Sequence, residues 1–326
     1  MAITGTGAQN DPYLVHSYDE LKTVTTDNSY CPQYEHRYIS LDADIDCNVY
    51  GSQFEWETIT LGHDSRGFTL DLNEHTIKNI SVKVNNSVID ASYAGTNTYG
   101  SWYSEFVGNG KILNVFTQPS STAYVIKGRG TANIISDLSM SVSLGNLSAG
   151  AFQNSNVKNS SIYLEQPQTS SSGAVLIYSD NNVGSGNERC GMENCDVLLN
   201  ISNQKICLIS GYHASTYAVG FDNCRIRGKN GSAALPQFYI SSFIVTNSVI
   251  DLDSTEASWT SGISPLSRYP MRTGSSGVIN WDKRASDQPS DNPSLYSCGM
   301  AAVSSSEIVN GDALRNAGFT VVNVVG

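Results

Sequence analysis

Three aspartates, Asp42, Asp44 and Asp46, alternate along one predicted strand, and this spacing places their carboxylates on one face. Aligned carboxylates can bind calcium or act as a catalytic acid and base. Alternation with buried apolar residues also produces a solvated strand face that has no chemical role. We favour the solvated face, and we predict no metal ion, no cofactor and no catalytic residue.

His75 follows Glu74 and would lie near Asp71 if the chain turns there, an arrangement that would suit a general base. A corner between two strands explains these polar residues equally well, and we favour that structural role. The sequences Gly-x-Ser-x-Gly, His-Glu-x-x-His and Gly-x-x-x-x-Gly-Lys, which mark hydrolases, zinc proteases and phosphate-binding loops, do not occur. We therefore lean toward a protein that is not an enzyme.

The seven cysteines are an odd number spread over a long chain, which argues against a disulfide framework. Cys190 and Cys195 have no companion pair at metal-ligand spacing, so a zinc site is disfavoured. We predict buried, reduced thiols.

Aromatic residues gather in an insert that is rich in Asn, Gly and Ser, namely Tyr93, Tyr99, Trp102, Tyr103 and Phe106. Tyr and Trp combine an apolar ring with a polar tip, so they can stack on a sugar or bury against another chain. They can equally pack the insert onto the protein's own strands. We predict that Tyr93, Tyr99, Trp102 and Tyr103 form a binding site for carbohydrate or protein.

The composition excludes a helical bundle, because 46 Ser, 29 Asn and 28 Gly among 326 residues favour turns over helix interiors. A net charge of -11 without any basic run disfavours nucleic acid and anionic membranes as partners. The sequence has no apolar stretch of membrane-spanning length and no recognisable signal peptide. We therefore expect synthesis in a host cytoplasm.

A loose theme recurs between about residues 70 and 255: Asn or Asp, a small residue, then alternating β-formers. It begins at Asn79, Asn114, Asp137, Asn159, Asn194, Asn223 and Asn247, at intervals of 35, 23, 22, 35, 29 and 24 residues. Such intervals are typical of a parallel β-solenoid in which Asn occupies a corner, adopts the left-handed conformation and forms an amide ladder. The alternative is an antiparallel sandwich, in which short strands also recur.

Different elements flank this region. We predict a strand over 11–15, a helix over 18–24 with Ser17 as its N-cap, and strands over 37–46 and 68–72. These elements would cap the open end of the stacked strands. The predicted domains are the cap with first strands (1–70), a parallel β-helix (71–255), and an irregular segment with a small helix-strand module (256–326).

Several short motifs between residues 5 and 80 resemble those of a known group of proteins. The matching residues are Gly5-Thr-Gly7, Asp11-Pro-Tyr-Leu-Val15, Tyr18-Asp-Glu-Leu21, Tyr38-Ile-Ser-Leu-Asp-Ala-Asp-Ile-Asp-Cys-Asn48, Trp56-Glu-Thr-Ile59 and Leu70-Asp-Leu-Asn-Glu-His-Thr-Ile-Lys-Asn-Ile80. They resemble the entry segment of right-handed parallel β-helix proteins of phages, prophages and Gram-positive bacterial surfaces. Where that pattern usually has Gly, this chain has Glu74. The resemblance implies an all-β, right-handed solenoid with a small N-terminal cap, and it implies no catalytic residues.

We therefore expect a structural or adhesive component of a tailed-phage virion, such as a tail tip, fibre or capsid-surface appendage. The expected partners are other virion proteins, two further copies in a homotrimer and a host surface polysaccharide. Two alternatives remain open. One is a tailspike-like polysaccharide depolymerase, a hydrolase or lyase on the same scaffold. The other is a bacterial surface adhesin.

Overall fold

The computed structural model describes residues 3–97, 100–118, 124–128, 134–145, 150–166, 174–179, 190–201, 206–211, 219–230, 238–239, 243–253, 277–280 and 300–303. Strands dominate this part of the chain, and nearly all of their pairings are parallel. The prediction of an all-β protein with parallel strands is confirmed, and an antiparallel sandwich is not what forms.

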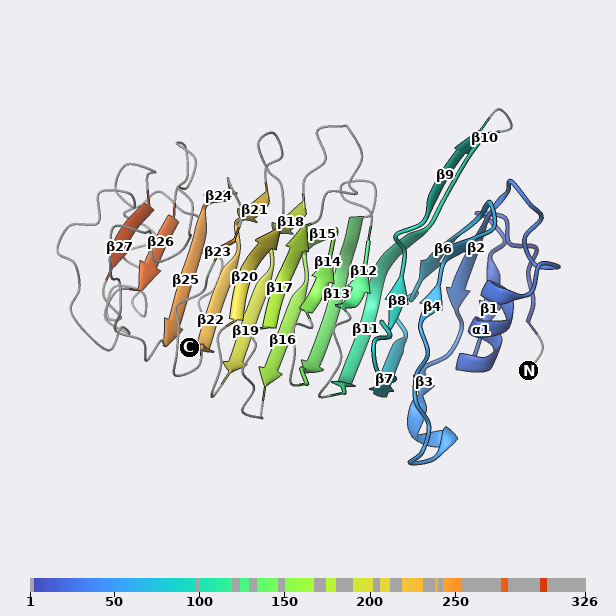
Figure 1. Cartoon of the computed structure of the whole chain (residues 1–326), viewed down its shortest axis with the longest axis horizontal. Helices are drawn as coiled ribbons and strands as arrows, with labels where there is room; N and C mark the ends of the chain where they lie inside the picture. The colour runs from blue at the N-terminus through green and yellow to red at the C-terminus, as the bar shows by residue number, and fades with distance from the viewer. Residues whose placement is uncertain are drawn as a thin grey trace.

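The strands lie side by side along the long axis of the molecule (Figure 1). We use "level" for the strands that one pass of the chain adds to this stack. The early levels contain β2 (His36–Leu41) and β3 (Ile45–Asp46); β4 (Ile59–Thr60), β6 (Arg66–Asp71) and β7 (Thr76–Val82); β8 (Ile89–Asp90) and β11 (Glu105–Thr117); and β12 (Tyr124–Lys127) and β13 (Ile134–Ser143).

Each later level contributes three strands. These are β14 (Gly150–Gln153), β15 (Asn156–Lys158) and β16 (Ser161–Gln166); β17 (Ala174–Ser179), β18 (Cys190–Glu193) and β19 (Asp196–Ile201); β20 (Ile206–Gly211), β21 (Val219–Asp222) and β22 (Arg225–Asn230); and β23 (Phe238–Tyr239), β24 (Phe243–Thr246) and β25 (Ser248–Asp253). The strands predicted to begin near Asn159, Asn194, Asn223 and Asn247 are β16, β19, β22 and β25. They pair in parallel in that order, as predicted.

Two further strands, β26 (Gly277–Asn280) and β27 (Met300–Val303), continue the pairing from β25. Parallel pairing therefore extends past residue 255 into the segment expected to be irregular. The helix-strand module predicted beyond residue 307 lies outside the described residues.

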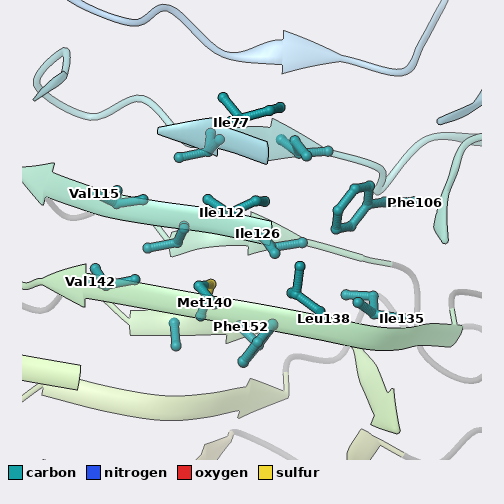
Figure 2. Close-up of a cluster of buried hydrophobic side chains, with 14 of the residues drawn as sticks. Ile77, Phe106, Ile112, Val115, Ile126, Ile135, Leu138, Met140, Val142 and Phe152 are labelled. Carbon is teal, nitrogen blue, oxygen red and sulfur yellow. The ribbon is translucent and has the colours of Figure 1, made fainter. Parts of the chain in front are cut away.

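Apolar side chains of successive levels stack in the interior. Ile112 is paired with Ile77 on one side and with Met140 on the other, and all three are buried (Figure 2). Ile126 and Phe152 form a second column on the smaller sheet. Because alternate residues face inward, one continuous core runs through the levels.

The predicted cap lies at the N-terminal end (Figure 1). It contains β1 (Tyr13–Val15), which pairs with β2, and α1 (Tyr18–Thr26), which begins at the N-cap Ser17 as predicted. The Ser17 side chain accepts a hydrogen bond from the Glu20 amide at 3.2 Å. Tyr18, Leu21, Val24 and Thr25 are buried, and the Tyr18 ring packs against Trp56 with 4.6 Å between ring centroids, so α1 covers apolar side chains beside β4.

The strand predicted over residues 37–46 is interrupted, because β2 ends at Leu41 and β3 begins at Ile45. Asp42 and Asp44 therefore lie in a turn rather than on one strand face with Asp46. After β3 the chain forms η1 (Cys47–Tyr50), whose N-cap is Asp46.

The recurrent Asn residues occupy left-handed corners, and their amides form hydrogen-bonded ladders. φ lies between 48° and 60° at Asn79, Asn114, Asp137, Asn159, Asn194, Asn223 and Asn247. The Asn194 amide donates to the Asn159 side-chain oxygen at 3.1 Å, and the Asn223 amide donates to that of Asn194 at 2.7 Å. The predicted corner conformation and ladder are confirmed.

The series nevertheless belongs to two ladders rather than one. Asn114 donates to Asn79, and Asn79 donates to Asp46. Asp137 instead lies level with Asn109 on β11, since Gly108 pairs with Ser136 and Gly110 with Leu138. By strand register this second series continues from Asp137 through Asn159 to Asn247, and the side-chain hydrogen bonds of Asn194 and Asn223 lie within it.

Glu74, at the position where the resembling proteins have Gly, has a φ of 65°. Its amide donates to the Asn109 carbonyl at 2.6 Å. A corner that needs the left-handed conformation explains why Gly is usual there, because a side chain in that region costs about 1 kcal/mol.

Candidate binding site at an aromatic hairpin

One element departs from the parallel stack. Strands β9 (Ala94–Asn97) and β10 (Gly100–Tyr103) pair antiparallel, with Asn97 opposite Gly100 and Ala94 opposite Tyr103. This hairpin extends away from the stacked strands (Figure 1). Of the predicted binding residues, Trp102 and Tyr103 lie on β10, Tyr93 lies immediately before β9, and Tyr99 is outside the described residues.

Tyr93 fixes the base of the hairpin to the second level. Its phenol oxygen accepts a hydrogen bond from the Ser65 amide at 2.9 Å. Ser104, on the other side of the base, donates to the Tyr93 carbonyl from its amide at 2.9 Å and from its hydroxyl at 2.8 Å. A Cβ at Gly62 would lie 2.7 Å from the Tyr93 ring. The ring therefore packs so closely on the main chain at position 62 that only glycine fits there.

Tyr103 holds the second strand of the hairpin against the outer face of β2 and β6. Its ring stacks on the imidazole of His36, with 4.4 Å between ring centroids and 28° between planes. A Cβ at Gly67 would lie 2.0 Å from the Tyr103 carbonyl oxygen. The main chain therefore crosses Gly67 at a distance that only glycine permits.

A polar chain continues from this stack. Thr69 donates through its hydroxyl to Glu105 Oε2 at 3.1 Å, which leaves its oxygen to accept from His36 Nε2 at 2.9 Å. The other imidazole nitrogen, Nδ1, is buried and has no hydrogen-bond partner within the described residues. Donation from Nε2 to Thr69 assigns a proton to that nitrogen.

Burial sets the acidity of this cluster, which we define as His36, Tyr38, Thr69, Tyr103 and Glu105. Desolvation lowers the pKa of His36 below its usual 6.5, and the Tyr103 main chain opposes this only in part. Burial also raises the pKa of Tyr38, with smaller contributions from Tyr103 and Glu105. Burial therefore favours the neutral forms of both His36 and Tyr38.

The carboxylates considered for catalysis each have structural partners. Asp42 accepts from His16 Nε2 at 3.1 Å, and Glu20 contacts His16 Nδ1 at 3.0 Å. His16 therefore links the cap helix α1, through Glu20, to the turn after β2, through Asp42.

The expected proximity of His75 to Asp71 is replaced by a contact with Asp44, whose Oδ1 lies 3.4 Å from His75 Nδ1. The same Asp44 oxygen accepts from the Thr76 amide at 2.9 Å. Asp71 instead accepts from the amide of Asn73 at 2.7 Å in the turn after β6.

Asp46 caps η1 and belongs to the first ladder. Hydrogen bonds from the Asn79 side chain and the Asn48 amide lower the pKa of its carboxyl. No group of three or more His, Cys, Asp or Glu side chains suited to a metal ion occurs in the part of the chain that the structure describes.

Five cysteines have described side chains, and all five are free and buried: Cys31, Cys47, Cys190, Cys195 and Cys224. Burial raises the pKa of the Cys47 thiol to about 12. Cys195 and Cys224 follow laddered Asn residues on adjacent levels, and their contact together with burial raises the pKa of Cys224. The predicted burial of these thiols is confirmed.

Comparisons with known proteins found no matching family model and no matching curated protein. One solved chain is similar, from the crystal structure of "a putative immunoglobulin A1 protease from Bacteroides ovatus". Its TM-score is 0.48 at 16% sequence identity, and the alignment covers 94% of this chain and 88% of that chain. A similarity of this size carries no argument about function. Among the described residues, no helix is long and apolar enough to cross a membrane.

Proposed function

We propose that this chain is a right-handed parallel β-helix that binds rather than cleaves, acting as a structural or adhesive component of a tailed-phage virion. The observation that carries the proposal is the uncharged, aromatic hairpin that leaves an otherwise regular stack. The virion setting is the one that the N-terminal resemblance implies. The expected binding partner is a host surface glycan.

The stack suits a rigid support. Strands of successive levels pair in parallel over long registers, such as six consecutive residues between β16 and β19. One buried core and two hydrogen-bonded ladders link the levels. A structure in which each level contacts mainly its neighbours transmits force along its axis, as a fibre or tail component must.

The hairpin suits a contact surface. Residues 91–104 include three Tyr and one Trp but no Asp, Glu, Lys, Arg or Pro. Aromatic side chains on an element fixed at its base lose little conformational entropy when they stack on a sugar ring. Tyr93 and Tyr103 hold that base, which leaves Tyr99 and Trp102 as the residues best tested for ligand contact.

The contacts of the acidic residues support binding over cleavage. Asp42 and Asp44 pair with His16 and His75, and Asp46 accepts ladder and capping hydrogen bonds. A glycosidase needs two carboxyl groups facing one bond at a separation of about 5 to 9.5 Å. These three carboxylates are instead engaged in joining the cap and the first levels.

The test is binding to arrayed bacterial capsular and cell-wall polysaccharides by the full chain and by Tyr99→Ala and Trp102→Ala. Loss of a hot-spot aromatic should weaken binding by about 1 kcal/mol or more, roughly fivefold in Kd. Tyr163→Ala, which removes a half-buried tyrosine from β16 on the stack, is the matched control and should leave Kd unchanged.

Release of reducing sugars or unsaturated fragments from such a polysaccharide would overturn the proposal. Loss of that release in Asp42→Asn, Asp44→Asn, Asp46→Asn or Asp71→Asn would establish the depolymerase alternative. Mass spectrometry of purified phage particles tests the virion assignment, which fails if the chain is absent from particles whose genome encodes it.

A further inference from the structure

We propose that the β9–β10 hairpin pairs edge to edge with the hairpin of a second copy of this chain. This inference does not rest on the proposed function, because strand edges carry main-chain groups whereas ligand-binding side chains project from strand faces.

The first observation is that the hairpin is a sheet of two strands. Strands β9 and β10 pair with each other, and within the described residues neither pairs with another strand. β9 therefore presents an outer edge of main-chain N–H and C=O groups, and β10 does so away from Tyr103, whose main chain lies against Gly67. An isolated two-stranded hairpin is marginally stable in water, and additional strands stabilise it.

The second observation is that the edges lack the usual protection. Natural edge strands are blocked by Lys, Pro, bulges or a covering element. The register from Ala94–Tyr103 to Asn97–Gly100 is regular, without a bulge. Residues 91–104 contain neither a charged residue nor a proline.

The third observation is that the hairpin is presented in a fixed direction. Gly62 and Gly67 let the base pack against the second level, and Tyr103 stacks on His36. In Figure 1 the two strands extend beyond the stack. A fixed, projecting edge loses less entropy on pairing than a mobile loop would.

Charge argues for a second copy as the partner. Two chains of net charge -11 repel one another, so an uncharged segment is a favourable place for them to meet. The hairpin provides such a place over fourteen consecutive residues. Identical edges of identical chains also meet the requirement that a symmetric interface be self-complementary.

The test is the oligomeric state of the full chain by sedimentation equilibrium. Thr96 and Ser101 lie opposite each other in the middle of the hairpin. The wild type should self-associate, and the Thr96→Lys/Ser101→Lys double variant should be monomeric at the same concentration, a loss of at least tenfold in association constant. Thr96→Val/Ser101→Val keeps strand formers without charge and should still associate.

The matched control is Ser52→Lys/Thr60→Lys, which adds the same two charges at exposed positions outside the hairpin and should associate like the wild type. Wild-type association should also strengthen as ionic strength rises from about 0.01 to 0.15 M, because screening over a Debye length that falls from about 30 to 8 Å reduces repulsion. A monomeric wild type at 0.15 M salt, or a Lys double variant in the hairpin that associates normally, overturns the proposal.

Discussion

Asn194 combines both properties that define the corners of the stack, so its substitutions separate them. Its φ is 55°, which places it in the left-handed region. Its amide donates to Asn159 at 3.1 Å, and its oxygen accepts from Asn223 at 2.7 Å. Asn194→Ala loses the ladder and forces a Cβ-bearing aliphatic residue into this conformation, whereas Asn194→Gly loses the ladder alone.

The magnitudes follow from these contacts. The left-handed conformation costs Ala about 1 to 2 kcal/mol. Two solvent-exposed hydrogen bonds contribute at the low end of their range, about 0.5 kcal/mol each. Asn194→Ala should therefore lower the free energy of unfolding by about 2 to 3 kcal/mol. Asn194→Gly should lower it by about 1 to 2 kcal/mol, because the flexibility of Gly in the unfolded chain adds up to about 1 kcal/mol.

The assay is equilibrium urea unfolding followed by far-UV circular dichroism. Asn200, exposed on the regular strand β19, is the control, since it is absent from the left-handed positions. There the order should reverse, with Gly more destabilising than Ala by about 0.5 to 1 kcal/mol. If Asn194→Ala lowers the free energy of unfolding by no more than Asn194→Gly does, the left-handed conformation at this corner does not contribute to the stability of the stack.

Four further predictions follow from the same structure. Ile226, which is fully buried in β22, should tolerate Asp poorly, and Ile226→Asp should cost several kcal/mol in thermal unfolding experiments. Because the pKa of His36 is lowered in the folded state, the unfolded state binds more protons below pH 6.5, so stability should fall as pH drops below that value and the dependence should flatten in His36→Gln. Iodoacetamide should leave Cys47 unmodified in the native protein and alkylate it in denaturant, as mass analysis would show. Gly67→Ala should displace Tyr103 and expose the hairpin to chymotrypsin, whereas an unchanged cleavage rate would mean that the crossing at Gly67 does not hold the base.

The stack was predictable because its signals are local and repeated. A corner Asn followed by alternating β-formers specifies a turn and an inward face without knowledge of distant residues. The assignment to ladders was not predictable in the same way, since β11 carries two left-handed Asn residues, Asn109 and Asn114. Only the pairing of Gly108 with Ser136 selects Asn109 as the neighbour of Asp137.

The binding segment was visible as an aromatic, uncharged insert, but the cluster at its base was not. His36, Thr69 and Glu105 lie on three levels and carry no shared spacing. They meet because β2 pairs with β6 and β6 with β11, which places Tyr38 and Glu105 on either side of Thr69. The one local signal was the pair of glycines, Gly62 and Gly67, within a strand-forming stretch.

These glycines explain how a regular stack accommodates an irregular insert. A side chain at Gly67 would clash with the main chain of Tyr103, and one at Gly62 would clash with the ring of Tyr93. Glycine at both positions lowers the strand propensity of the second level, but it lets the base of the hairpin pack directly against that level. The aromatic residues of the insert therefore divide by position: Tyr93 and Tyr103 secure the base, and the strands beyond them are free of charge and unpaired at their edges within the described residues. A function that uses this hairpin should depend on the glycines as strongly as on any aromatic residue at its tip.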